Sequence, residues 1–112
     1  MEFFDIVMKD ESLFIAYMGD SPTIRVLDYL LTERDLDFSL TDIALHARIG
    51  RATLYRILGN LIQYQLITPT RIVGRAKLYK LDKENTVIKK LIEIDDMLIK
   101  KELRMRKGIE VA

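Results

Sequence analysis

The sequence contains no cysteine, and His46 is its only histidine. The absence of cysteine excludes disulfides and thiolate chemistry, and it is typical of a protein from a reducing, intracellular compartment. A zinc site built on cysteine and histidine ligands is implausible for the same reason. We therefore expect no metal site, and we predict a surface or boundary role for His46.

Long hydrophobic runs are also absent. The longest, LFIAYM at 13–18, is far shorter than the ~20 apolar residues that a membrane-spanning helix needs. The first residues, MEFFDIVMKDE, carry acids where a signal peptide would need positive charge. These features predict a cytoplasmic protein without a membrane partner. An apolar share of 49% and a charged share of 31% are those of an ordinary globular protein, here most simply one domain of 112 residues.

The middle of the chain lacks negative charge, since no aspartate or glutamate occurs from Ile43 to Leu81. Residues 1–47 carry three bases and ten acids, a net charge of −7, whereas residues 48–80 carry seven bases and no acid, a net charge of +7. Residues 81–112 carry eight bases and seven acids, a net charge of +1. This division predicts an anionic partner with a defined footprint. The alternative is that acids elsewhere in the chain neutralise these bases after folding.

Apolar spacing and capping residues predict the first helices. Residues 2–18 have the pattern of one or two short helices. Ser21 and Pro22 predict the start of the next helix, because serine can cap free N–H groups and proline fits the first helical position. An apolar stripe with helical spacing continues from there to about Glu33.

Two shorter helices are predicted in the middle of the chain. After a possible short strand at Phe38, Ser39 is a second capping residue, and LTDIALHA follows it. Arg48-Ile49-Gly50 breaks this helix, and we attribute the break to Gly50, because glycine accepts backbone angles that other residues resist. A third helix is predicted from Arg51 to about Tyr64.

A β-hairpin and a long helix complete the pattern. LITPTRIV and KLYKLD are β-rich runs separated by Gly74-Arg75-Ala76, which predicts a hairpin. Pro69 implies an edge or irregular position in the first of these strands. The longest helical pattern runs from about Glu84 to Lys107.

The stretch SLTDIALHARIGRATLYRILGNLIQYQLI resembles the consensus of winged helix-turn-helix transcription regulators, and the resemblance covers roughly residues 21–82. It implies a winged helix-turn-helix with a β-hairpin wing. Together with the helical pattern that follows it, this predicts an α+β, mostly α fold with a long C-terminal helix. We therefore divide the chain into an N-terminal helical segment (1–20), a winged helix-turn-helix domain (21–82) and a C-terminal dimerisation helix (83–112). The ends of the chain also resemble small archaeal regulators of this type.

The sequence departs from the family pattern at two positions. Gly50 stands at the cap position of the third helix, where serine is common, so that a capping hydrogen bond is missing. Gln65 stands where many relatives carry glycine at the end of that helix, so that the entry into the wing can differ. Neither departure removes the fold.

The resemblance implies that the third helix and the wing bind DNA. If Leu54, Leu58 and Leu61 face the core, the opposite side of that helix can enter the major groove, where arginine pairs with guanine. A carboxylate on that side would repel phosphates. The candidate DNA-binding residues are Arg48, Arg51, Ala52, Thr53, Tyr55 and Arg56 around the helix, and Arg71, Arg75 and Lys77 on the wing.

Three of these residues have other possible roles. Arg51 could begin a solvated helix face, and Arg56 could pair with an acid of the first helix. Tyr55 could pack on the wing.

The C-terminal helix predicts a homodimer. About 24 helical residues would extend about 36 Å, farther than the radius of gyration of about 13 Å expected for a chain of this size. Its apolar residues form two adjoining stripes, of which one can cover the domain and the other can meet a second copy. The predicted dimerisation residues are Val87, Leu91, Ile94 and Leu98. The alternative is a helix that lies across its own N-terminal segment.

We therefore predict a sequence-specific regulator of transcription that binds double-stranded DNA as a homodimer. The alternative is a winged-helix module that docks an acidic protein partner. The two differ in whether the basic residues converge on the third helix and the wing or scatter around the fold. No catalytic constellation is present, so that we do not expect an enzyme, and no residue indicates a cofactor. Whether a small-molecule effector exists is left open.

Overall fold

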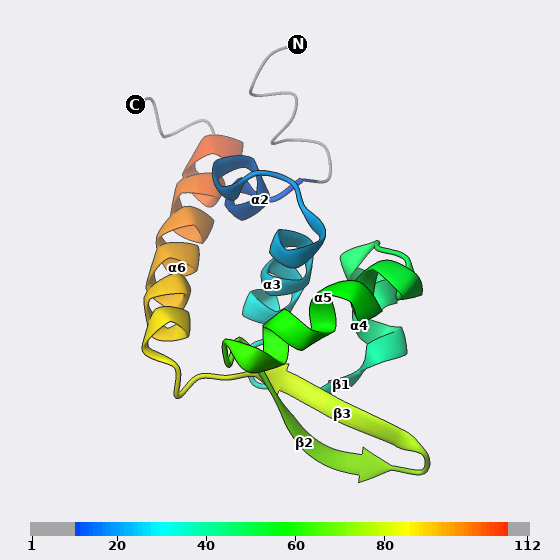
Figure 1. The fold of residues 1–112 in the computed structure, drawn as a ribbon. Coiled ribbons are helices and arrows are strands. Elements are labelled where there is room, and N and C mark those ends of the chain that lie inside the picture. Colours follow the sequence, from blue (N-terminus) through cyan, green and yellow to red (C-terminus); the bar gives the residue numbers. More distant parts are fainter. Residues whose placement is uncertain (1–10, 108–112) are drawn as a thin grey trace.

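The computed structural model describes residues 11–107 (Figure 1). The elements in chain order are α2 (Leu13–Met18), α3 (Pro22–Thr32), β1 (Phe38–Ser39), α4 (Leu40–Ala47), α5 (Arg51–Gln63), β2 (Ile67–Val73), β3 (Ala76–Leu81) and α6 (Thr86–Arg106). The predicted α+β, mostly helical fold is thereby confirmed. Of the helices predicted over residues 2–18, α2 is described, and the remainder lies outside the described residues.

The predicted capping residues begin the helices as expected. The side-chain oxygen of Ser21 accepts a hydrogen bond from the Ile24 backbone N–H, and that of Ser39 accepts one from the Asp42 N–H. Gly50 precedes α5 without a side-chain cap, as its lack of a side chain requires.

The turn between α4 and α5 differs from the prediction in one respect. Arg48, with a φ of 59°, adopts the left-handed conformation, whereas Gly50 has an ordinary extended φ of −71°. The attribution of the break to the freedom of Gly50 is therefore wrong. The reason is that α4 ends at Ala47, and a left-handed residue directly after it turns the chain so that the N–H of Ile49 bonds the Ala44 carbonyl at 3.1 Å, while the Arg48 N–H bonds that of Leu45.

The three strands form an antiparallel sheet in the order β1-β3-β2. Phe38 of β1 and Pro69 of β2 both lie opposite Tyr79 of β3. As predicted, β2 is an edge strand and is irregular, with a β-bulge between Pro69 and Ile72. Gly74, with a φ of 63°, makes the turn of the hairpin that forms the wing (residues 67–81).

The buried side chains form one hydrophobic core to which all the described helices contribute. It includes Leu13 and Phe14 of α2, Leu30 and Leu31 of α3, Ile43 of α4, Leu54 and Leu61 of α5, and Ile88 and Leu98 of α6. Residues 11–20, 21–82 and 83–107, the described parts of the three predicted segments, therefore contribute to one core. In Figure 1, α6 lies beside α2 and α3 on one side of the molecule, and the wing extends from the opposite end. None of the helices within residues 11–107 is long and apolar enough to cross a membrane.

Candidate nucleic-acid interface

Helix α5 has a buried face and an exposed face. Leu54 and Leu61 are buried and Leu58 is partly buried, as the spacing predicted. The opposite side carries four exposed side chains, those of Arg51, Ala52, Tyr55 and Arg56. Thr53 is half-buried between the two faces, and its hydroxyl oxygen accepts a hydrogen bond from Arg56 Nη2 at 3.0 Å.

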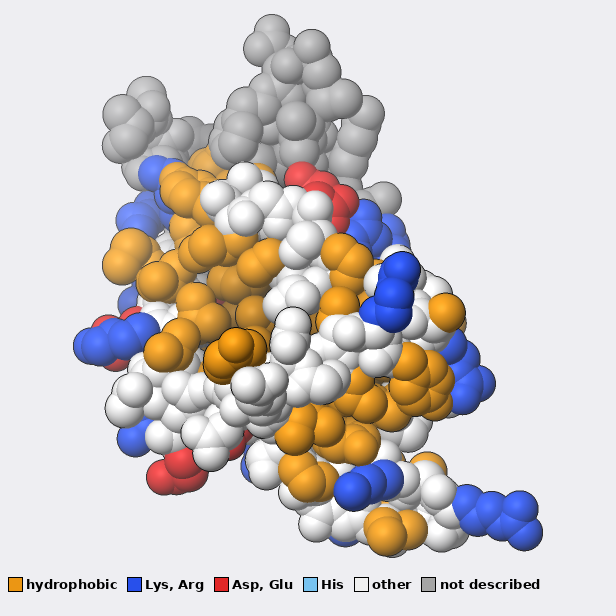
Figure 2. Space-filling view, in the orientation of Figure 1, with side chains coloured by type: hydrophobic (Ala, Val, Ile, Leu, Met, Phe, Trp, Pro, Cys, Tyr) orange, Lys and Arg blue, Asp and Glu red, His pale blue; other side chains and the backbone are white. Residues whose placement is uncertain are grey.

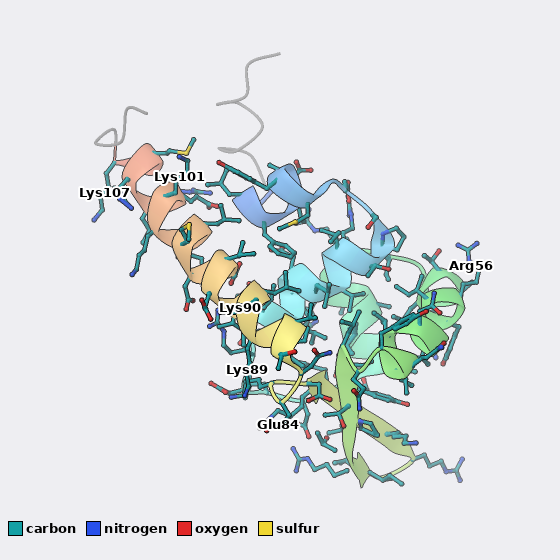
Figure 3. All side chains as sticks on the ribbon, turned by 60° about the vertical axis from the view of Figure 1, so that its left-hand side comes forward. Arg56, Glu84, Lys89, Lys90, Lys101 and Lys107 are labelled. Atoms are coloured by element: carbon teal, nitrogen blue, oxygen red, sulfur yellow. The ribbon has the colours of Figure 1, made fainter. Side chains whose placement is uncertain are left out.

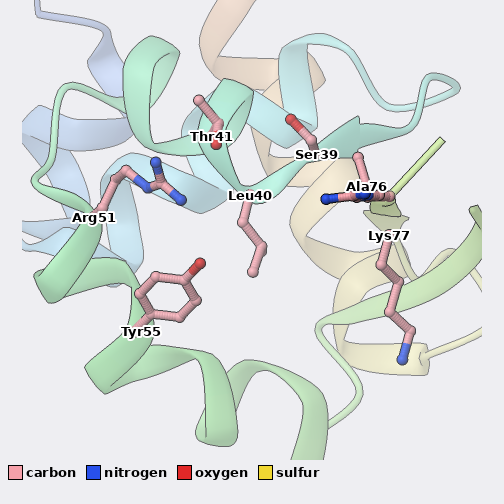
Figure 4. A pocket seen from close by; sticks show the side chains of 8 residues that line it. Ser39, Leu40, Thr41, Arg51, Tyr55, Ala76 and Lys77 are labelled. Carbon is pink, nitrogen blue, oxygen red and sulfur yellow. The ribbon is translucent and has the colours of Figure 1, made fainter. Parts of the chain in front are cut away.

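A cleft of about 350 Å³ joins α5, the start of α4 and the wing. Arg51 and Tyr55 line it from α5, residues 39–41 line it from the start of α4, and residues 75–77 line it from the wing. Figure 4 shows Arg51 and Tyr55 extending from α5 toward Leu40, with Ala76 and Lys77 across the cleft. The fold therefore brings together basic residues that are about 25 positions apart in the sequence.

The cations of this surface have no acidic partner within the described part of the chain. Arg51, Arg56, Arg75 and Lys77 form no ion pair with any carboxylate of residues 11–107. The alternative in which Arg56 pairs with an acid of the first helix is therefore not observed among these residues. In Figure 2 the wing and the α4–α5 side show Lys and Arg side chains, and the acids visible on this face of the molecule lie elsewhere.

The two remaining basic candidates have different surroundings. Arg48 is exposed at the turn between α4 and α5, where its carbonyl oxygen accepts a hydrogen bond from Arg25 Nη1 at 3.4 Å. Arg71 is exposed on the wing but pairs with Asp37, with 2.9 Å between Arg71 Nε and Asp37 Oδ2. No local pattern indicates this pair, because the two residues are 34 positions apart in the chain.

Basic side chains also occur on α6, on the other side of the molecule. Figure 3 shows Lys89, Lys90, Lys101 and Lys107 distributed along α6, whereas Arg56 lies on α5 away from them. Acids alternate with these lysines along α6, and Lys90 pairs with Glu93. The cations of α6 are thus interspersed with acids in the sequence, whereas α5 and the wing contain cations but no acid.

The predicted dimerisation stripe is divided between the core and the surface. Val87 is 59% exposed and Leu98 only 7%, while Leu91 and Ile94 are partly buried against the core. Leu98 therefore packs in its own domain, because the face of α6 that covers α2 and α3 includes it. The exposed large apolar side chains of α6 are Val87, Met97, Ile99 and Leu103.

The remaining candidate sites are structural. His46 is exposed on α4, where its ring stacks on Tyr29 with 4.9 Å between centroids and Nδ1 lies 2.9 Å from the Asp42 carbonyl oxygen. Within residues 11–107, no group of three or more His, Cys, Asp or Glu side chains could hold a metal ion.

No protein-family model and no curated protein matches the sequence. Solved structures match the fold. A mutant of ZitR from Lactococcus lactis in complex with DNA is 15% identical with a TM-score of 0.60, over 95% of this chain and 73% of that chain. MepR, a transcription regulator of the Staphylococcus aureus multidrug efflux pump MepA, is 18% identical with a TM-score of 0.58, over 86% and 70% of the two chains.

A MarR-family transcriptional regulator from Silicibacter pomeroyi is also 18% identical with a TM-score of 0.58, over 86% of this chain and 64% of that chain. At these identities the likeness establishes the fold, which is that of winged-helix regulators of this type. The resemblance to archaeal regulators stays a prediction.

Proposed function

We propose that this chain is a transcription regulator that binds double-stranded DNA in a sequence-specific manner as a homodimer. Helix α5 enters the major groove, and the wing contacts the backbone or the minor groove. The observation that carries the proposal is the convergence around one cleft of exposed cations of α5 and the wing that have no ion pair within residues 11–107. Scattered cations would have favoured the alternative, a module that docks an acidic protein.

The exposed side of α5 suits a groove in shape as well as in charge. A helix with its side chains is about 10–12 Å in diameter and the major groove is about 12 Å wide, so that the 13-residue α5 can lie in the groove. The small side chain of Ala52 allows a close approach to the bases. Arg51 and Arg56 can each donate two hydrogen bonds to a guanine, and each such contact contributes about 1–3 kcal/mol of discrimination.

The exposed apolar residues of α6 support the homodimer. Ile99 and Leu103 are exposed and four residues apart, so that they share one face of the helix. A second copy of α6 would remove these side chains from water. A symmetric dimer would then present two copies of α5 to half-sites about 34 Å apart, one turn of DNA.

The experiment that tests DNA binding is a titration of the protein with duplex DNA at 50 and 200 mM salt. Binding through four phosphates would weaken about 100-fold over this range. Arg51→Ala/Arg56→Ala should weaken binding by at least about 30-fold, because two base contacts are lost. The matched control is Lys89→Ala/Lys90→Ala, which removes the same charge from α6 and should leave binding within about threefold.

Two results would contradict the proposal. Absence of binding at 50 mM salt would favour the protein-docking module. Binding that depends on salt but is equally strong in Arg51→Ala/Arg56→Ala would place the contact outside α5.

Sedimentation of the free protein tests the homodimer. The wild type should sediment as a dimer, and Ile99→Lys/Leu103→Lys should sediment as a monomer. Leu36→Lys/Leu45→Lys is the matched control, because it adds the same charge at two other exposed leucines. A wild type that is monomeric at tens of micromolar would refute this part of the proposal.

A further inference from the structure

The wing is tied to the rest of the domain by one carboxylate. Asp37 lies directly before β1, and its oxygens accept hydrogen bonds from three donors on β2. These donors are Thr70 Oγ1 at 2.6 Å, Arg71 Nε at 2.9 Å and Arg71 Nη2 at 3.2 Å. Because β3 lies between β1 and β2, the Asp37 side chain reaches across the central strand to the edge strand.

The two residues that Asp37 holds are those of the β-bulge. Pro69 lies opposite Tyr79 and Ile72 lies opposite Lys77, so that Thr70 and Arg71 together face the single residue between them on β3. A bulge bends its strand and increases the local twist, and its residues lack regular ladder partners. The Thr70 hydroxyl lies 3.3 Å from the Leu78 carbonyl oxygen on β3 as well. The side-chain bonds to Asp37 therefore fix the bend beyond which the tip of the wing extends.

The pair also neutralises one charge of the wing. The Asp37 side chain is 17% exposed, and that of Arg71 is 65% exposed. Hydrogen bonds from Arg71 and Thr70 lower the pKa of Asp37 to about 2, so that the carboxylate is ionised at neutral pH. The positive charge of Arg71 is thus matched within the chain, whereas Arg75 and Lys77 have no such partner among residues 11–107.

We propose that Asp37 is a positioning residue for the wing. With Thr70 and Arg71 it forms a latch that sets the direction of the wing tip, and Arg75 and Lys77, but not Arg71, supply the phosphate contacts of the wing. This inference rests on the DNA-binding function proposed above. It gives Arg71 a structural role in place of the DNA contact predicted from the sequence.

The salt dependence of DNA binding distinguishes a latch cation from a phosphate-binding cation. Each neutralised phosphate contributes about 0.9 to the slope of log K against log salt concentration. Arg75→Ala should therefore reduce the slope by about 0.9. Arg71→Ala should weaken binding severalfold, because the free wing then samples several directions and must be ordered on binding. Arg75 and Lys77 still reach their phosphates in the complex, so that the slope stays at the wild-type value.

Substitution of Asp37 should make DNA binding more dependent on salt, whereas Arg75→Ala makes it less dependent. Asp37→Asn keeps an oxygen for the Thr70 hydroxyl but releases Arg71, which can then reach a phosphate, so that the slope should steepen by about 0.9. In Asp37→Asn/Arg71→Ala the slope should return to the wild-type value. If Arg71→Ala fails to fold, Thr70→Val serves instead, with the same expectation of weaker binding at an unchanged slope.

The latch can also be tested without DNA. In the free wild-type protein the carboxyl carbon of Asp37, followed by NMR, should titrate near pH 2, and in Arg71→Ala its pKa should move back toward the ordinary aspartate value of 3.8. Titration of the wild type near 3.8 would overturn the latch. The latch would also be overturned if Arg71→Ala reduced the salt slope of DNA binding as much as Arg75→Ala does. An unchanged salt slope in Asp37→Asn would overturn it as well. A wild type that binds no duplex DNA refutes the proposed function itself, before any variant is compared.

Discussion

The two ends of the molecule use charge in opposite ways. Around α5 and the wing, exposed cations border a cleft and, apart from Arg71, have no carboxylate partner within residues 11–107. Where α6 packs beside the end of α3, Arg34 and the buried Asp95 form an ion pair that is largely withdrawn from water. Arg34 Nη2 lies 3.2 Å from Asp95 Oδ2 and 3.1 Å from Asp96 Oδ1, and its Nε donates to the Leu31 carbonyl oxygen.

The two groups of cations differ in whether a carboxylate of the same chain pairs with them. An exposed, unpaired cation adds little to stability, so that it can be kept for an external partner. A half-buried cation beside a buried carboxylate is required for the fold, because removing it leaves the carboxylate uncompensated. Substitutions of the exposed cations around α5 and the wing should therefore affect DNA binding, and substitutions of the buried pair beside α6 should affect stability.

The largest effect on stability is expected at Arg34. The Asp95 side chain is only 6% exposed, and Arg34→Ala would leave it without its cation. We expect the free energy of unfolding, measured with urea, to fall by about 3 kcal/mol. Arg51→Ala, the matched change at the other end, should alter it by less than about 0.5 kcal/mol. Equal losses in the two variants would remove the distinction between the two ends.

The next largest effect depends on pH. Burial, together with the charges of Asp28 and Asp96, raises the pKa of Asp95 to about 6 against the attraction of Arg34. Because the pKa of Asp95 in the folded protein lies above the ordinary aspartate value of 3.8, the native state keeps this proton to higher pH than the unfolded chain does. This group therefore lowers the stability as the pH rises from about 4 through 6, and its full cost is present above about 7.

Asp95→Asn removes this ionisation and keeps a polar side chain beside Arg34. We expect it to raise the unfolding free energy by about 2 kcal/mol at pH 7.5, and the gain should vanish near pH 4. Urea denaturation at both pH values measures the difference. Asp96→Asn, at the exposed neighbour, is the control and should show little pH-dependent gain. A variant of Asp95 that is no more stable than the wild type at pH 7.5 would contradict the raised pKa.

Most elements could be predicted from the sequence because their signals are local. Ser21 and Ser39 are the caps of α3 and α4, and Pro69 lies in an irregular edge strand. The residue that makes the α4–α5 turn could not be identified in this way. Glycine tolerance pointed to Gly50, but the left-handed position is fixed by the exact end of α4 and falls on Arg48.

The candidate site was only partly predictable. The carboxylate-free stretch identified the exposed face of α5, because charge and helical spacing can both be read along the chain. The pair of Asp37 and Arg71 depends on a contact across the sheet, which no local pattern indicates. The burial of Leu98 likewise depends on how α6 is rotated against α2 and α3, since both apolar stripes of this helix are compatible with the sequence.

A smaller effect is expected at the joint between the two ends. Gln65 follows α5 and has a φ of 57°, in the left-handed region. Its carbonyl oxygen accepts a hydrogen bond from the side-chain Nδ2 of Asn85, the residue that caps α6. Gln65→Gly should relieve the left-handed strain and raise the unfolding free energy by about 1 kcal/mol. Calorimetry should show a melting temperature higher by about 5 °C.

Affinity for DNA should stay within about twofold in Gln65→Gly, because Gln65 belongs to neither charged surface. The control is Gln63→Gly, inside α5, which should be destabilised by about 1 kcal/mol instead. If both variants lost stability alike, the left-handed geometry at Gln65 would not be the source of the strain.

The smallest expected effect on stability is at Gly50. Two substitutions of this residue differ only in whether they add a negative charge beside the exposed face of α5. An added Cβ would have Thr53 Oγ1 as a neighbour at 3.9 Å, an ordinary contact. Gly50→Ser and Gly50→Asp should each supply the missing cap of α5 and raise the unfolding free energy by a few tenths of a kcal/mol, about equally. Only Gly50→Asp places a carboxylate beside Arg51, so that its affinity for DNA should fall about tenfold while that of Gly50→Ser is retained. Equal DNA affinities of the two variants in a titration at 50 mM salt would mean that the absence of acids from this face is unrelated to binding.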